Sequence, residues 1–579
     1  MLKTLLRYLG AYKKQTILAP ITMILEVAME VTIPFLMSRI INIGIANRDM
    51  AYITQIGLLM IGMAFLSLCF GMLTSRLSST SGAGFAQNLR RALFAKIQDF
   101  SFSNIDRFST ASLVTRLTTD VTSVQNTFMM SLRLAVRAPV MLVFAVIMAI
   151  SINTELATVF LVAVPVLAAT LVFVMSRAYP RFRKMLAEYD KMNRNVQEDL
   201  IGIRVVKAFV REDHETEKFR EVSTQVMKLQ YAAERIVIWI MPMMMFVIYA
   251  CMIAISWFGG VRIINGTMLT GDLMSFVSYT TQILMSLMMM GMVFMMIVIT
   301  RASFTRIAEV LDEKTDIVSP KDGISEVPDG SVAYKNVRFR YSTGSGEPTL
   351  CDIDLAISAG QTVGVMGATG SAKTTLVQLI PRLYDVEAGS VLVGGNDVRD
   401  YDLKTLRDSV AIVLQNNVLF SGTIRENLKW GNADSTDDEI EKACRIAQAH
   451  DFIMSFPNGY DTDLGQGGVN LSGGQKQRLC IARALLKRPQ IMILDDSTSA
   501  VDTDTDRRIR SGLKQELAGM TTIIIAQRIA SIMDADQIVV LDEGKVSAVG
   551  THEELMQESE IYREVFASQR KGVDEYAKA

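Results

Sequence analysis

The segment GATGSAKTT (367–375) contains the residue types that bind nucleotide phosphates. An apolar, strand-like run precedes it and a helix-like run, TTLVQLI, overlaps its end, which is the context that a phosphate-binding loop requires. In such a loop, backbone N–H groups hold phosphate oxygens, the lysine reaches the β- and γ-phosphates, and the threonine hydroxyl binds Mg²⁺. The expected nucleotide contacts are Gly367, Ala368, Thr369, Gly370, Ser371, Ala372, Lys373, Thr374 and Thr375, with Thr374 as a Mg²⁺ ligand.

One position of this loop departs from the usual pattern, because Ala372 stands where a glycine precedes the lysine. A methyl group there can crowd the phosphate, or strain the loop by ~1–2 kcal/mol if the residue adopts a left-handed conformation. Nucleotide binding is still expected, at an affinity that this methyl group affects. Taken alone, the motif is also compatible with a glycine-rich turn that carries a lysine by chance.

Two further motifs argue against chance. IMILDD (491–496) is an apolar run that ends in two carboxylates, an arrangement that places Asp495 near Mg²⁺ or its water. LSGGQ (471–475) precedes a helix-like run, and a fixed string of five residues has a chance probability on the order of 10⁻⁴ in a chain of this length. Together, the three motifs predict a domain that binds nucleotide phosphates with Mg²⁺.

The elements that must position these residues lie in the second half of the chain. Strand-like and helix-like runs alternate from 331 to 569, which favours an α/β domain with a largely parallel sheet. The polar segment 312–330, which contains proline and glycine, is interpreted as a linker. The polar stretch 570–579 is interpreted as a disordered tail.

The first 311 residues have the composition of a membrane domain. Apolar residues make up 50% of the whole chain and charged residues 21%, and the mean hydropathy is +0.27. A helix needs about 20 largely apolar residues to cross a bilayer. Such runs predict six transmembrane spans, the first of which is interrupted by Glu26 and Glu30, at approximately 16–38, 50–75, 132–154, 156–176, 236–261 and 273–300.

Charge is distributed unevenly along the chain. Residues 1–320 have a net charge of +9 and the remainder −10, so neither part has the strongly basic surface of a nucleic-acid binder. The connectors 76–137 and 177–235 contain eight and thirteen Lys or Arg residues. The positive-inside rule therefore places these connectors and both termini in the cytoplasm, in a multi-pass membrane protein. The connectors are expected to extend the spans as helices that turn near 104–121 and 198–212.

Other residue patterns leave alternatives open. The five cysteines are scattered and predict neither a disulfide framework nor a zinc site. Methionines are concentrated in 241–246 and 284–296, which suits apolar packing or, alternatively, a pliable wall for apolar ligands. Glu26 and Glu30 lie one helical turn apart and are compatible with a cationic substrate or a proton, or with a polar seam between helices.

Nearly the whole chain resembles the ATP-binding cassette (ABC) transporter family, and within it the bacterial exporters that fuse six spans to one nucleotide-binding domain. The resemblance implies that Tyr341 of NVRFRY stacks on adenine and that Gln415 of VLQNNVLFSGTIRENL contacts Mg²⁺ and water. LSGGQ is the family signature, and STSAVD (497–502) is the loop after the second carboxylate. The contacts implied in this way are Tyr341, Leu471, Ser472, Gly473, Gly474, Gln475 and Asp502, with Gln415 and Asp495 as Mg²⁺ ligands.

Two catalytic positions depart from the family pattern. Asp496 stands where a glutamate normally polarises the attacking water; its carboxylate is drawn back by ~1.5 Å, which can cost on the order of 100-fold in rate. Gln527 stands where a histidine normally contacts the γ-phosphate, and glutamine neither carries a positive charge nor titrates. With Ala372, these changes predict a degenerate site that binds ATP and hydrolyses it slowly or not at all.

The intact signature predicts a partner chain. In the family, each ATP lies between the phosphate loop of one nucleotide domain and the signature of another, so a chain with six spans is half of a dimeric transporter. The expected partner is a second, non-identical half-transporter that carries the competent ATPase site. The expected function is ATP-driven export of an amphipathic compound, drug-like or lipid-like.

Two alternatives to this function stay open: a homodimeric exporter with two slow sites, and a non-pumping, ATP-gated regulatory or channel-like subunit. A peptide exporter with an N-terminal protease is disfavoured, because the first span begins within about 20 residues of Met1. An importer subunit is disfavoured because importers of this family usually keep the nucleotide domain on a separate chain.

Overall fold

The computed structural model describes residues 7–341, 346–496, 501–516 and 519–576. The chain divides into two compact units: Met1–Gln98 with Ala111–Glu313, and Asp99–Thr110 with Lys314–Ala579. The first unit is helical and the second is an α/β domain, as the sequence predicts.

The helical unit contains six helical stretches long and apolar enough to cross a membrane, within the described residues. Their number agrees with the six expected spans, and they are Arg7–Ile45, Met50–Gln98, Thr110–Ile152, Thr154–Ile201, Glu212–Ile264 and Thr270–Asp312. At 49 residues, α3 (Met50–Gln98) is about 70 Å long, more than twice the ~30 Å thickness of the hydrocarbon layer. The helices therefore extend well past the apolar runs, as expected for the connectors. The remaining long helices of this unit are α2 (Lys13–Arg39), α6 (Val121–Ile152), α7 (Thr154–Ile201), α9 (Glu212–Val237), α10 (Ile240–Ile264) and α11 (Thr270–Asp312).

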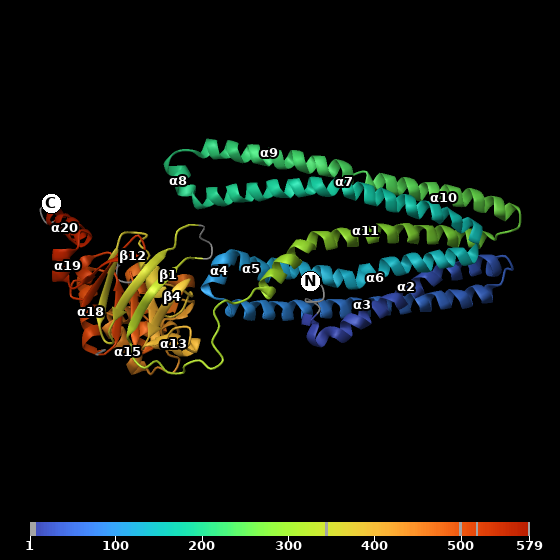
Figure 1. Ribbon diagram of the computed structural model, residues 1–579. Coiled ribbons are helices and arrows are strands. Elements are labelled where there is room, and N and C mark those ends of the chain that lie inside the picture. Colours follow the sequence, from blue (N-terminus) through green and yellow to red (C-terminus); the bar gives the residue numbers. More distant parts are fainter. Residues whose placement is uncertain (1–6, 342–345, 497–500, 517–518, 577–579) are drawn as a thin grey trace. The chain divides into compact units, whose positions relative to one another are not determined.

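Short helices occupy the far ends of the extensions. Between α7 and α9, which lie side by side, the short helix α8 (Ile203–Ala208) sits within the predicted turn 198–212 (Figure 1). In the other connector, α3 ends at Gln98 and α4 (Phe102–Phe108) begins after Ser101, whose side chain accepts a hydrogen bond from the Asn104 N–H. The turn between the two helices therefore starts a few residues before the predicted segment 104–121, because Ser101 provides an N-cap that starts a new helix.

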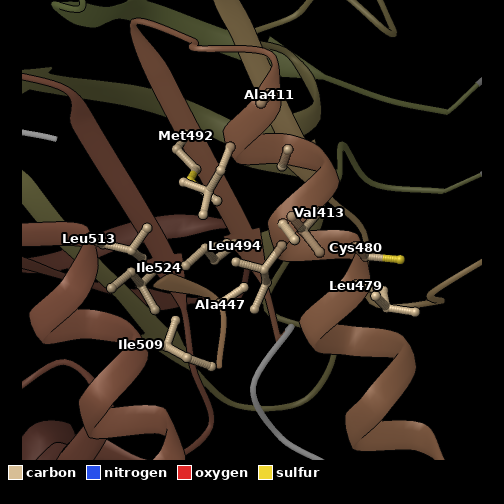
Figure 2. Close-up of a cluster of buried hydrophobic side chains, with 14 of the residues drawn as sticks. Ala411, Val413, Ala447, Leu479, Cys480, Met492, Leu494, Ile509, Leu513 and Ile524 are labelled. Atoms are coloured by element: carbon tan, nitrogen blue, oxygen red, sulfur yellow. The ribbon is translucent and has the colours of Figure 1, made fainter. Parts of the chain in front are cut away.

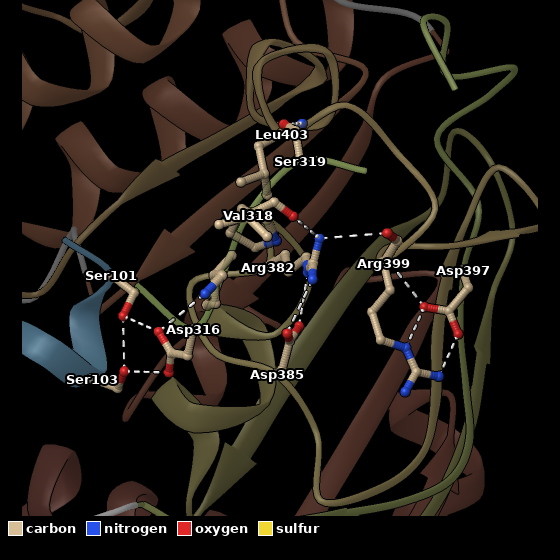
Figure 3. A network of polar contacts seen from close by, with 12 residues as sticks. Ser101, Ser103, Asp316, Val318, Ser319, Arg382, Asp385, Asp397, Arg399 and Leu403 are labelled. Carbon is tan, nitrogen blue, oxygen red and sulfur yellow. Dashed lines mark hydrogen bonds and ion pairs between the residues drawn. The ribbon is translucent and has the colours of Figure 1, made fainter. Parts of the chain in front are cut away.

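The helix α4 packs with the α/β unit. Ser101 and Ser103 donate to the two carboxylate oxygens of Asp316, which follows α11 in the chain (Figure 3). The Tyr384 hydroxyl donates to Asp106 of α4 at 2.8 Å. Burial alone would raise the pKa of the Asp316 carboxyl, but the hydrogen bonds from Ser101 and Ser103 hold it below its usual value. The expected linker 312–330 is thus anchored by charge-assisted hydrogen bonds at Asp316.

The α/β unit contains two main sheets. The six-stranded sheet has the order β12-β11-β3-β10-β9-β6, in which neighbouring strands are parallel except for the β12–β11 pair. Its strands are β3 (Thr362–Gly367), β6 (Val410–Val413), β9 (Ile491–Asp495), β10 (Thr521–Ile525), β11 (Gln537–Asp542) and β12 (Lys545–Gly550). This sheet confirms the predicted parallel arrangement.

A second, antiparallel sheet was not foreseen. Its order is β2-β1-β4-β5, with β1 (Val332–Phe339), β2 (Leu350–Ile357), β4 (Ala388–Val393) and β5 (Asn396–Asp397). Strand β2 alternates buried and exposed residues, whereas all five residues of β9 are buried. Apolar runs reveal the fully buried strands of a parallel sheet, and half-exposed strands lack that signal.

The core of this unit fixes the strands that carry the site. Met492 and Leu494 of β9 belong to one buried cluster with Leu479 of α17 (Gly473–Leu486) and Leu513 of α18 (Thr503–Glu516), part of which Figure 2 shows. The chain then ends in α19 (His552–Glu558) and α20 (Glu560–Tyr576). Helix α20 continues to Tyr576, past residue 570, the expected start of a disordered tail.

Candidate nucleotide-binding site

The predicted phosphate loop connects β3 to α12 (Lys373–Gln378). Ala372 precedes α12 with φ 69° and ψ 23°, the left-handed conformation. A residue with a Cβ in this conformation is strained by roughly 1–2 kcal/mol, and a glycine would not be. The strain anticipated for this alanine is therefore present in the loop.

The amine of Lys373 is turned back into its own loop. Its Nζ donates to the carbonyl oxygens of Gly367 at 3.0 Å and Ala368 at 2.8 Å. Burial lowers the pKa of Lys373, while the nearby charges of Asp495 and Asp496 oppose that shift. The cation is thus held at the centre of the loop, where a phosphate can replace carbonyl oxygens as its partner.

The carboxylate of Asp495 lies beside the start of α12. Thr374 Oγ1 donates to Asp495 Oδ1 at 3.1 Å, and Asp495 Oδ2 is buried with no hydrogen-bond partner among the described residues. Burial raises the pKa of Asp495, and Asp496 contributes to the same shift; the Thr374 hydrogen bond and the Lys373 charge oppose it. A hydroxyl and an unpaired carboxylate oxygen are the hard ligands that Mg²⁺ prefers, so these residues fit the metal that the sequence predicts.

The neighbouring carboxylate, Asp496, is held by Gln527. Gln527 Nε2 donates to Asp496 Oδ2 at 2.9 Å, and Gln415 also hydrogen-bonds this carboxylate. Burial raises the pKa of Asp496, whereas the hydrogen bond from Gln527 and the charge of Lys373 lower it. The two positions that depart from the family pattern therefore contact each other directly.

These residues line one cavity of about 550 Å³. Among the expected site residues, its lining includes Gly367, Ala368, Thr369, Gly370, Ala372, Lys373, Thr374, Thr375, Gln415, Asp495, Asp496 and Gln527. Ser371, also a residue of the loop, is buried and is not part of the lining. Residues as far apart in the chain as Gly367 and Gln527 thus converge at the carboxyl ends of β3, β9 and β10, the usual ligand edge of a parallel sheet.

Helix α20 supplies a wall of this cavity that the motifs do not reveal. Ile561 and Val565 line it, and Gln569 holds the segment that carries Gln527. Gln569 donates to the Gln527 carbonyl at 2.7 Å and accepts from the Ile529 N–H at 2.9 Å. The apolar spacing of four residues between Ile561 and Val565 is the one sequence signal that could have shown an amphipathic helix here.

Tyr341 lies outside the cavity lining. Its hydroxyl is 2.9 Å from Thr375 Oγ1, and its ring packs edge-on against Phe339 and Tyr384. The expected stacking of Tyr341 on adenine stays a prediction.

The LSGGQ segment also lies outside this cavity. Ser472 caps α17: its hydroxyl accepts from the Gln475 N–H, and the Gln475 side chain accepts from the Ser472 N–H. Ser472 and Gly473 are exposed, so the N-terminus of a 14-residue helix is open to solvent. Such a terminus suits an anion brought by another molecule.

Part of the loop after Asp496 lies outside the described residues, namely 497–500. Asp502 accepts from the Thr505 N–H at 2.9 Å and does not line the cavity. Its predicted contact with nucleotide is untested.

Comparisons with known proteins agree with this architecture. The family model for the ABC transporter transmembrane region matches residues 16–288, and the one for the ABC transporter matches 350–499. An uncharacterized ABC transporter ATP-binding protein of Bacillus subtilis (strain 168), YfiB, is 39% identical over 97% of this chain and 98% of its own length.

Two other similar proteins have more informative descriptions. The ATP-dependent lipid A-core flippase of Syntrophus aciditrophicus (strain SB) is 32% identical over 96% of this chain and 92% of its own. A solved bacterial Atm1-family ABC exporter with ATP bound matches with a TM-score of 0.84, covering 97% of this chain and 99% of that one, at 24% identity. The similarity to this solved exporter shows a shared fold.

Proposed function

The chain belongs to the ABC transporter family, and from this premise we propose that it is one half of a heterodimeric, ATP-driven exporter with a degenerate nucleotide site of its own. The Asp496–Gln527 hydrogen bond of 2.9 Å carries the proposal. It joins a shortened carboxylate to an uncharged amide at the positions where a water-polarising glutamate and a γ-phosphate-binding histidine are expected.

This site can bind ATP without hydrolysing it efficiently. Backbone N–H groups of the loop and Lys373 hold the phosphates, and Thr374 with Asp495 would hold Mg²⁺, which offsets phosphate charge. The carboxylate of Asp496 reaches less far than a glutamate and is already engaged by Gln527 and Gln415. A misplaced base of this kind loses on the order of 100-fold in rate.

The exposed signature completes a site elsewhere. Ser472 and Gly473 present the open end of α17 away from the chain's own cavity lining, so they are available to the ATP of a second nucleotide domain. ATP binding then joins the two domains, the helical extensions carry this closure to the spans, and hydrolysis in the partner's site resets the transporter. The termini and connectors lie in the cytoplasm, and the spans lie in the cell membrane.

The exported compound is amphipathic, drug-like or lipid-like. The 32% identical relative named as a lipid A-core flippase supports a lipid-like class. The methionines of α11 supply apolar surface that adapts to ligands of different shapes.

Steady-state ATP hydrolysis by the chain purified alone in lipid, beside Lys373→Ala, tests the proposal. We expect ATP binding with negligible hydrolysis. A substantial rate that Lys373→Ala abolishes would overturn the degenerate site and establish the homodimeric exporter. ATP-dependent substrate movement with the partner present distinguishes a pump from a regulatory subunit.

A further inference from the structure

The helical unit contains a charged cavity of about 310 Å³. Three charged side chains, Glu26, Arg133 and Arg137, line it together with Met23, Met289 and Gly71. These residues come from α2, α3, α6 and α11, and all lie within the segments expected to cross the membrane. Ionisable groups in such segments are costly and mark functional sites unless they are fully paired.

One of the two arginines is fully engaged. Arg137 donates from Nη1 to Glu26 Oε1 at 2.6 Å and from Nη2 to Glu30 Oε2 at 2.5 Å. Both nitrogen termini of this guanidinium are thereby occupied by carboxylates of α2. The polar seam that was one interpretation of these glutamates is therefore present, and Arg137 is its other side.

Two side chains that line this cavity have polar groups available to a ligand. Glu26 Oε2 is buried and accepts no hydrogen bond from any described residue. Arg133 lies one helical turn before Arg137 on α6 and lines the cavity, and it has no ion pair or hydrogen bond within the described ranges. A buried acceptor and a guanidinium thus stand in one space without partners, which is costly in a low-dielectric setting.

Gly71 makes room beside this acceptor. A Cβ at this position would lie 3.3 Å from the Glu26 carboxyl group, a contact tighter than most. A bulkier residue would fill the space next to the free oxygen. The glycine thus keeps the polar end of the cavity open, while Met23 and Met289 form apolar wall.

We propose that this cavity binds the acidic head of an amphipathic substrate, with Arg133 as the anion-binding residue. The phosphate or carboxylate group accepts from the Arg133 guanidinium, a neighbouring hydroxyl or ammonium group donates to Glu26 Oε2, and the apolar body contacts the methionines. This inference rests on the proposed export function and names its substrate class.

Binding of a fluorescent anionic amphiphile to the full chain tests the inference. The probe is dansyl-aminoundecanoic acid in dodecyl maltoside micelles, and its methyl ester is the uncharged control. We expect the acid to bind more tightly than the ester. Arg133→Gln should weaken acid binding by about tenfold or more, as the loss of one charge-assisted hydrogen bond predicts, and leave ester binding unchanged.

Two further variants control for folding and for charge. Arg133→Lys keeps the positive charge and should retain acid binding to within a few-fold. Arg301→Gln removes an exposed arginine of α11 outside the cavity lining and should change nothing. Displacement of the probe by dodecyl phosphate or by laurate identifies the preferred acid.

Three results would overturn the inference: equal binding of acid and ester to the unmodified chain, full acid binding by Arg133→Gln, or stronger displacement by dodecyltrimethylammonium than by either anion. The acid–ester comparison needs no variant, so it decides the question even if Arg133→Gln does not fold. The assay needs no ATP hydrolysis, so its failure is distinguishable from a failure of the proposed nucleotide-site asymmetry.

Discussion

At the scale of single residues, the nucleotide site combines intact binding groups with altered catalytic ones. Lys373, Thr374 and Asp495 line the nucleotide cavity and are the residues proposed to hold phosphate and Mg²⁺, whereas Gln527 donates a hydrogen bond to Asp496. In this proposal, ATP binding depends on the charge of Lys373 and on the backbone N–H donors of the loop, and both are present. We propose that hydrolysis depends on the position of one carboxylate to within about 1 Å, and that aspartate at position 496 changes this position.

Restoring the two altered side chains should restore hydrolysis. In the complex with a partner chain whose own ATPase site is disabled, Asp496→Glu combined with Gln527→His should raise single-turnover hydrolysis at least about tenfold, because the longer carboxylate reaches the water and the imidazole contacts the γ-phosphate. Asp496→Gln combined with Gln527→His has the same side-chain length without the charge and should give no gain. An equal rate in both double variants would show that carboxylate reach is not the limiting feature.

The buried Asp495 should make the empty site less stable than it could be. Its pKa is raised, so its ionisation opposes folding: the folded state is favoured at low pH and loses that stability as pH rises through the raised pKa. Asp495→Asn should therefore raise the midpoint of thermal unfolding by ~2–4 °C at pH 7 without nucleotide. The gain should shrink as pH falls, and stabilisation by Mg²⁺–ATP should be lost.

A scan of thermal midpoints across pH checks this expectation. Asp502→Asn is the matched control, because hydrogen bonds from its own loop lower the pKa of that exposed carboxyl, and no gain is expected there. A gain in midpoint from Asp495→Asn, relative to the unmodified chain, that is larger at low pH than at neutral pH would contradict the argument.

At the scale of elements, α20 positions the segment that follows β10. Gln569 bonds the chain on both sides of Arg528, through the Gln527 carbonyl and the Ile529 N–H. Ile561 and Val565 place the same helix against the nucleotide cavity. The C-terminal helix thus supports the residue that holds Asp496.

Removing this support should loosen the segment locally. Gln569→Ala should speed amide exchange in 526–531 by about 30-fold, because two hydrogen bonds of roughly 1 kcal/mol each are lost, with little change in global stability. Hydrogen–deuterium exchange with mass spectrometry measures this. Gln557→Ala, at an exposed glutamine of α19, should leave the segment unchanged. Unaltered exchange in Gln569→Ala would show that α20 does not hold the segment.

At the scale of the whole molecule, the proposed function gives the chain a degenerate nucleotide site and an intact signature. Its phosphate loop lies in the altered cavity, and its signature lies at the exposed end of α17. In a heterodimer the signature serves the partner's ATP, so substitutions at the two places should have different effects.

Gly473→Asp in the complex should reduce steady-state hydrolysis by about 100-fold, because a carboxylate at the helix N-terminus repels the partner's γ-phosphate. Lys373→Ala should reduce it only a few-fold, because it affects the slow site. ATPase measurements on complexes purified through a tag on each chain give both values. Equal, severe losses for the two variants would indicate two equivalent sites, as in a homodimer.

The sequence by itself determined the features that reside in contiguous residues. Hydropathy over about 20 residues defines each span, and the phosphate loop, the signature and the carboxylates after β9 are local strings. Even the strain at Ala372 could be anticipated, because the loop type fixes the backbone conformation there. These features depend on residues that are adjacent in the chain, and such residues can be read directly from the sequence.

Only the tertiary structure decided which distant side chains meet. Arg137 and Glu26 are 111 positions apart, Gln527 and Asp496 are 31 apart, and α20 reaches the cavity from the end of the chain. The antiparallel sheet likewise depends on pairing between half-exposed strands. Such contacts arise from packing and burial across elements, and no local pattern encodes which partner a buried charge will find.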